Sequence, residues 1–195
     1  MTLFVDGALN RARAELLLEG LPQDVPEIFV DYLKRVFASP LSEVHGTMEE
    51  EFIRAATVVA RVSLGTRMVP GDFAPENANS ALNAIGLSAH FPPPLEVLIS
   101  GGVVDRRTLG GMTILRFGLD PVAEHLAAIH SVGNLRRLQR AEVDLLINGL
   151  TNIEGYPSSC DGYLKAFATR YRAYSGPFGL PDIVFPWEAR PRDLG

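Results

Sequence analysis

Two histidines beside a glutamate are the residues of this sequence best suited to metal chemistry. Glu124 precedes His125 in the stretch "EHLAAIH", and His130 ends it. A zinc protease requires the order H-E-x-x-H on a helix, which places both imidazoles one turn apart on the same face. Here the order is inverted, and the longer spacing turns His130 about 100° past that face. We therefore interpret both histidines as structural and predict no metal ligand.

A nucleophile is the second kind of chemistry to consider. Cys160 is the single cysteine, so it forms no internal disulfide, and no motif pairs it with a histidine. The surrounding "GYPSSCDG" lacks the G-x-S-x-G spacing that presents a serine on a sharp turn. The chain also has no G-x-x-x-x-G-K-[ST] phosphate loop and no aliphatic run ending in paired acids to hold magnesium. We expect no catalytic residue, no bound cofactor and no enzyme activity.

The charge balance argues against nucleic acid as a partner. Of 195 residues, 47% are hydrophobic, and the formal net charge is −5, whereas nonspecific DNA binding rests on Lys and Arg that neutralise phosphates. Arg136, Arg137 and Arg140 form a basic group, which we interpret as a solvated helix face in preference to a contact for phosphate or an acidic partner. One cysteine, no basic-then-apolar leader and no membrane-length apolar run predict a cytoplasmic protein without a membrane partner.

The element that carries Glu124 and the histidines begins at an abrupt change of hydrophobic period. In "ILRFGLDPVAEHLAAIH", residues 114–130, the strand-like pattern becomes helical at Asp120-Pro121. Aspartate is favoured at a helix N-cap because its carboxylate accepts hydrogen bonds from free N–H groups, and proline is tolerated at the first helical position. We therefore predict that Asp120 caps this helix.

Ahead of this helix, the pattern predicts a β-hairpin with helices before it. The stretch "VVDRRTLGGMTILRF" reads as strands 103–107 and 112–117, joined by a turn at Gly110 and Gly111. Three helices, a hairpin and a further helix describe a mainly α protein with a winged helix-turn-helix, flanked by helical segments. Helices are predicted at 9–19, 24–36, 49–64 (buried and central), 77–85, 94–100, 134–149 and from Asp161 onward.

These elements divide the chain into four predicted segments. They are a helical lid-like segment at 1–45, a winged-helix domain at 46–132, a C-terminal helical extension at 133–174, and an irregular tail at 175–195. The tail is broken by proline and glycine, and we expect it to pack through Phe185 and Trp187.

Because winged helices commonly read DNA, a free-standing transcription regulator is the alternative function. The predicted recognition helix, "PLEVLISGG", contains no Lys, Arg, Asn or Gln for base edges, and Glu96 repels phosphate. Arg106 and Arg107 on the hairpin are the best remaining contacts. The sequence therefore favours a function other than DNA binding.

Several stretches resemble the region behind the nucleotide-binding core of bacterial NACHT-type STAND NTPases. They are "LPQDVPEIFVDYLKRV" (21–36), "RAATVVARVSL" (54–64), "GGMTILRFGLDPVAEHLAAIH" (110–130) and, more loosely, "GYPSSCDGYLKAFATRYRAY" (155–174). In that family a helical lid leads to a winged-helix module whose strand-to-helix junction is similar to "LRF-x-LDP-x-AE-x-LA". The resemblance covers residues 3 to 174.

The resemblance implies a signalling switch that holds ADP in a closed form and opens on ATP exchange. Our hypothesis is a non-catalytic regulatory module that docks on a nucleotide-binding NTPase core, in its own parent chain or in a separate protein. In related switch proteins a Met-His-Asp motif touches the nucleotide phosphate, but Leu119 stands at the His position and cannot donate a hydrogen bond. The resemblance marks these junction residues as regulatory: Arg116, Phe117, Leu119, Asp120, Pro121 and Glu124.

The first residues of the sequence suggest where such a core lies. The opening stretch "MTLFVDGALNRARAELLL" contains the apolar residues Leu3, Phe4 and Val5 without an obvious partner. In the family pattern this point lies within the lid, just behind the NTPase core. We therefore expect a phosphate-loop NTPase encoded immediately upstream, or a separate nucleotide-binding protein that covers these residues.

Overall fold

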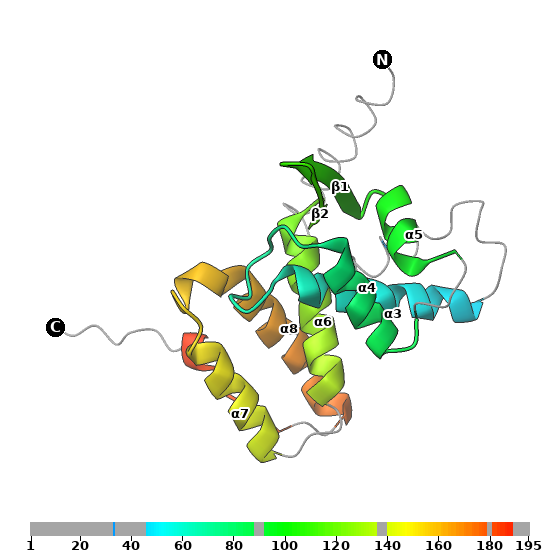
Figure 1. Cartoon of the computed structure of the whole chain (residues 1–195). Coiled ribbons are helices and arrows are strands. Elements are labelled where there is room, and N and C mark those ends of the chain that lie inside the picture. The colour runs from blue at the N-terminus through cyan, green and yellow to red at the C-terminus, as the bar shows by residue number, and fades with distance from the viewer. Residues whose placement is uncertain (1–32, 34–45, 88–91, 136–139, 179–180, 189–195) are drawn as a thin grey trace, which may run out of the picture.

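The computed structural model describes residues 33, 46–87, 92–135, 140–178 and 181–188, which form a mainly helical protein with an antiparallel hairpin (Figure 1). The helices are α3 (Gly46–Ser63), α4 (Pro75–Ala84), α5 (Pro94–Ser100), α6 (Asp120–Leu135), α7 (Arg140–Thr151) and α8 (Asp161–Phe178). The strands are β1 (Val104–Leu109) and β2 (Met112–Phe117), and the short 3-10 helices are η1 (Ser158–Cys160) and η2 (Pro186–Glu188). The predicted helices 9–19 and 24–36, and the segment 1–45 with them, lie outside the described residues except for Leu33, which is buried.

The hairpin forms where the sequence predicts it. β1 and β2 pair antiparallel, with Leu109 opposite Met112 beside the turn. Gly110 and Gly111 make this two-residue turn with φ angles of 58° and 80°, the left-handed geometry that a type I′ turn requires and that glycine adopts without strain. The predicted second strand is confirmed, and β1 runs past its predicted end.

A short extended segment at Phe73, in the loop between α3 and α4, pairs with β2 of the hairpin. The Phe73 N–H donates to the Leu115 carbonyl oxygen at 2.9 Å, and the Leu115 N–H donates back to Phe73 at 2.8 Å. The ring centroids of Phe73 and Phe117 lie 6.4 Å apart, and both rings are buried. The segment covers part of the free edge of β2 and fastens the loop before α4 to the hairpin.

Helix α6 lies between α3 and α8 and packs mainly against these two helices (Figure 1). Residues 55–60 of α3 are all buried, which confirms the prediction of a central helix there. Both α3 and α6 are rich in fully buried alanines, and small side chains let neighbouring helix backbones approach closely. These alanines are Ala55, Ala56 and Ala60 on α3, and Ala123, Ala127 and Ala128 on α6.

Helix α6 is longer than the sequence pattern indicates. The pattern predicts a new helix start at Asn134, but α6 runs on to Leu135. Val132 and Leu135 are buried, so they continue the core-facing stripe of the helix across the exposed Gly133. Packing of this kind outweighs the weak helix propensity of a glycine. The predicted helix start is therefore wrong, and the predicted domain boundary after residue 132 falls inside α6.

The C-terminal region also departs from prediction in part. The sequence predicts an irregular tail from residue 175, but α8 continues to Phe178. Beyond α8, Phe185 is fully buried, and its ring stacks with that of the partly buried Trp187 at a centroid distance of 4.8 Å. The predicted packing of these two aromatic residues is confirmed.

Candidate functional site

The junction between β2 and α6 is held by an arginine that contacts two carboxylates. Arg116 Nη2 lies 3.2 and 3.3 Å from the two carboxylate oxygens of Asp120, and Nη1 lies 3.8 Å from Asp72 Oδ1. The three side chains come from β2, the start of α6 and the loop before α4. Exposed ion pairs contribute little to stability, about 0–1 kcal/mol each. The contribution of Arg116 is therefore chiefly to orient these three parts relative to one another.

Asp120 does not cap α6 through its side chain. The first backbone hydrogen bonds of the helix run from the N–H groups of Val122 and Ala123 to the carbonyl oxygen of Leu119, at 3.2 and 3.3 Å. Leu119 therefore occupies the N-cap position, and Asp120 and Pro121 are the first helical residues. The capping prediction is wrong because Arg116, four residues earlier, engages the carboxylate instead. An acidic residue in the first turn still interacts favourably with the helix dipole.

Two apolar junction residues anchor the turn to the core. Phe117 is buried, and Leu119 is partly buried against the core cluster. Between them, the Gly118 N–H donates to the Val103 carbonyl oxygen at 3.1 Å. A side chain at Gly118 would meet the Gly102 carbonyl oxygen at 3.4 Å, so the backbones approach closely here. The turn into α6 is thus fixed by packing on one side and by Arg116 on the other.

Glu124, on the next turn of α6, has an unusual environment for a carboxylate. Burial, with the nearby charges of Asp120 and Asp161, raises the pKa of Glu124 to about 7. Its carboxylate lies against Gly162 at the start of α8, where an added Cβ would stand only 2.2 Å from Oε1. Glycine at position 162 therefore makes room for the carboxylate.

The two neighbouring acids each pair with a cation, whereas Glu124 pairs with no cation among the described residues. Asp120 contacts Arg116, and Asp161 Oδ2 lies 2.7 Å from Lys165 Nζ. Within the part of the chain that the structure describes, Glu124 makes no hydrogen bond or ion pair. Glu124 is thus a carboxyl group on α6 that lies against α8. Among the described residues, no neighbouring cation offsets its negative charge.

The candidate metal ligands and nucleophile are not brought together. His125 Nδ1 lies 2.9 Å from the Pro121 carbonyl oxygen, an ordinary contact one turn back along α6, and burial lowers the pKa of this histidine. His130 Nε2 lies 3.1 Å from the Asn134 amide nitrogen. Cys160 is buried, and burial raises the pKa of its thiol, which disfavours the reactive thiolate. Among the described residues, no group of three or more His, Cys, Asp or Glu side chains could hold a metal ion.

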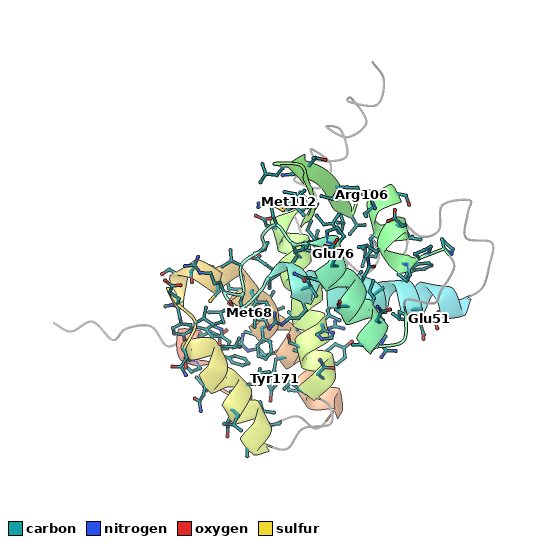
Figure 2. All side chains as sticks on the ribbon, viewed as in Figure 1. Glu51, Met68, Glu76, Arg106, Met112 and Tyr171 are labelled. Carbon is teal, nitrogen blue, oxygen red and sulfur yellow. The ribbon has the colours of Figure 1, made fainter. Side chains whose placement is uncertain are left out.

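The arginines of the hairpin are occupied by carboxylates. Arg106 Nη2 lies 2.5 Å from Glu96 Oε1 on α5, and Figure 2 shows Arg106 on the hairpin beside that helix. Arg107 Nη2 lies 3.4 Å from Asp105 Oδ2. Of the predicted basic group, Arg136 and Arg137 lie outside the described residues, and Arg140 begins α7. The best candidate phosphate contacts of the hairpin are thus already paired with acids.

Sequence reasoning found the junction but missed two of its participants. Asp72 lies far from Arg116 in the sequence, and no motif surrounds it. Gly162 carries a local signal, since a glycine directly after the helix-starting Asp161 is unfavourable for a helix and suggests close approach by another group. That signal does not identify the group, which is Glu124.

No family model, curated protein or solved structure matches this chain. Among the described helices, none is long and apolar enough to cross a membrane. The geometry of the junction is therefore the main basis for a functional proposal.

Proposed function

We propose that the chain is a non-catalytic regulatory module that docks on the nucleotide-binding core of a NACHT-type STAND NTPase and takes part in its ADP/ATP-controlled switch. The observation that carries this proposal is the braced junction between hairpin and helix. β2, the loop before α4 and the start of α6 are joined by Arg116 and by the backbone pairing of Phe73 with Leu115.

The fold that we propose for residues 46–132 is a winged helix. Helices α3, α4 and α5 precede the hairpin, and α6 follows it directly. The segment at Phe73 adds an isolated β-bridge at the edge of β2. This order of elements supports the resemblance to the winged-helix region of the STAND family, in which the same junction carries the regulatory residues.

A braced junction suits a switch because it transmits displacement. If a bound core pushes on the hairpin, the buried Phe117 and the short turn at Gly118 carry the movement from β2 into α6, which contacts both α3 and α8. Arg116 keeps the junction oriented during that movement. Rigid elements that share such contacts convert a local change into the movement of a whole helical segment. Leu119 offers no hydrogen bond to a phosphate, so the module acts through surface docking rather than by phosphate contact at that position.

DNA binding is the less favoured function because the arginines of the hairpin are already paired with acids. Glu96 and Asp105 already neutralise Arg106 and Arg107, and three of the seven residues of α5, namely Pro94, Leu95 and Leu98, are buried. Phosphate and base contacts would have to displace these ion pairs.

Site-specific photo-crosslinking tests the docking proposal. One variant carries a benzophenone amino acid in place of the exposed Pro121, at the junction. The matched control variant carries it in place of the exposed Asn83 on α4. In lysate of the source cells, we expect position 121 to capture a protein with a G-x-x-x-x-G-K-[ST] loop, in a yield that differs between added ADP and a non-hydrolysable ATP analogue.

Two outcomes would contradict the proposal. One is equal capture of the same proteins from positions 121 and 83, which would mean nonspecific contact. The other is a sequence-selective shift of duplex DNA by the purified chain that survives 200 mM salt, roughly the range in which nonspecific binding is lost. The second result would make the free-standing transcription regulator the better assignment.

A further inference from the structure

A groove runs between α7 and the C-terminal segment that follows α8. Its volume is about 670 Å³, which falls within the range of about 300–1,000 Å³ that ligand-binding clefts occupy. One wall is the part of α7 that carries Asp144, Ile147 and Asn148, and the other is the segment 182–186, which leads into η2 (Figure 1). We call this cleft the α7 groove.

The segment wall resembles a single β-strand that is fixed in place. Exposure alternates along it, since Phe185 is fully buried whereas the neighbouring Val184 is 86% exposed, and a period of two is that of an extended chain. Just before the segment, the Tyr171 hydroxyl of α8 donates to the Pro181 carbonyl oxygen at 2.6 Å. The wall is therefore held before any ligand binds, which lowers the entropy cost of binding.

The middle of this segment has unused backbone hydrogen-bonding groups. Within the part of the chain that the structure describes, the N–H and carbonyl groups of Ile183 and Val184 form no hydrogen bond. Both residues line the groove. An extended chain with free N–H and carbonyl groups is a template for pairing with a second chain.

The α7 wall adds an apolar surface and, with the segment, negative charge. Ile147 is a buried side chain at the groove, and the exposed Asn148 carries an amide that can both donate and accept hydrogen bonds. Asp144 on α7 and Asp182 on the segment place one carboxylate on each wall, and no Lys, Arg or His is among the described residues that line the groove. This charge favours a cationic ligand over an anionic one.

We propose that the α7 groove binds an extended peptide of basic and apolar residues, supplied by a partner protein, as an added strand beside Ile183 and Val184. In this mode of recognition the main-chain hydrogen bonds supply affinity, and contacts of alternate side chains supply specificity. The segment 182–186 spans roughly 16 Å at the rise of a strand, so it pairs with a stretch of about five residues. The site is separate from the hairpin-to-helix junction and does not depend on the docking role.

Titration with a defined peptide tests the ligand class. The probe is acetyl-Val-Lys-Val-Lys-Val-amide, and the matched control replaces both lysines with glutamate. Trp187 is the single tryptophan and follows Pro186 of the groove, so its fluorescence reports binding. We expect saturable binding of the basic peptide, with the acidic peptide at least about tenfold weaker. Equal affinity for the two peptides, or no saturable binding of the basic one, overturns the proposal.

Methylation of the peptide backbone tests strand addition. The N–H groups of an extended peptide point alternately to its two sides, so two versions of the basic peptide are compared, one methylated at its lysine nitrogens and the other at its valine nitrogens. The version whose methyl groups face the segment should bind about tenfold more weakly, because it loses main-chain hydrogen bonds, and the other should bind nearly as well as the parent. Equal affinity of the two methylated peptides contradicts strand addition.

Substitution locates the site on the protein. Asp144→Asn and Asp182→Asn should each weaken binding of the basic peptide by about two- to fivefold at low salt, as expected for exposed charges. The matched control is Glu76→Gln, an exposed acid of α4 that does not line the groove, and it should leave the affinity unchanged. In amide NMR spectra the peptide should shift the signals of Ile183 and Val184 most. Equal losses in all three variants, or the largest shifts elsewhere, reject the α7 groove as the site.

Discussion

At the scale of single residues, Glu124 links the fold to pH. Its folded-state pKa, about 7, lies above the ordinary value of 4.5, so folding favours the protonated form. Stability from this group is fully present below pH 4.5 and is lost as the pH rises through 7. The group is partly exposed, and solvent screening reduces the effect to about 1–2 kcal/mol.

Glu124→Gln should therefore stabilise the protein at pH 8 by about 1–2 kcal/mol and change little at pH 4.5. Urea unfolding of both proteins from pH 4.5 to 8 measures the difference, and the exposed Glu76→Gln serves as the control. Comparison with the variant is essential because His125 and His130 have lowered pKa values and act in the opposite direction. A difference between wild type and Glu124→Gln that does not vary with pH would contradict the assigned pKa.

Gly162 controls the same carboxyl from the α8 side. In Gly162→Ala, the new Cβ occupies the place of the Glu124 carboxylate, which must swing toward solvent. We expect the pKa of Glu124 to fall toward 4.5, as followed by carboxyl carbon NMR. Stability at pH 8 should not decrease, because alanine is favoured over glycine in a helix. An unchanged pKa of Glu124 would show that its environment does not depend on Gly162.

Much of the junction could be identified from the residue types in the local sequence, whereas the distant residues that complete it could not. Arg116, Asp120 and Glu124 stand out because a strand meets a helix at that point. The capping role of Asp120 could not be settled from the sequence, since a nearby arginine competes for the carboxylate and local rules do not rank the two contacts. Asp72 and Gly162 join the junction only through tertiary structure.

At the scale of elements, two glycines respond in opposite ways to the same substitution. Gly111 has a φ of 80° in the hairpin turn, so Gly111→Ala should destabilise the protein by about 1–2 kcal/mol. Gly133 lies exposed within α6 with open space around it, so Gly133→Ala should stabilise by roughly 0.5–1 kcal/mol. Thermal unfolding of the two variants tests both signs. A stabilising Gly111→Ala would mean that the turn is not type I′.

Elements with strong local signals were predicted well, and those set by packing were not. α5 and β2 match their predicted bounds, because prolines, glycines and a change of period mark them. α6 runs past Gly133, since the buried Val132 and Leu135 keep the helix in contact with the core, and α8 runs past Gly176 and Pro177. Such contacts are long-range and leave no mark near the boundary.

At the scale of the whole molecule, the C-terminal segment returns to α8 and closes an aromatic cluster. Phe185 lies 5.4 Å from Tyr171 and 5.9 Å from Phe167, centroid to centroid, and the Tyr171 hydroxyl donates to the Pro181 carbonyl oxygen at 2.6 Å. Phe185→Ala should cost about 3–5 kcal/mol, as measured by urea unfolding. Val184→Ala, at a side chain that is 86% exposed, should change stability by less than about 0.5 kcal/mol. Equal effects of the two would place Phe185 outside the core.

The buried alanines of α3 and α6 bear on how this protein can evolve. Each is fully enclosed, so a larger side chain at any one of them forces the helices apart or is rejected. Drift at these positions is therefore confined to paired changes that conserve total volume, while the exposed surface is free to diverge.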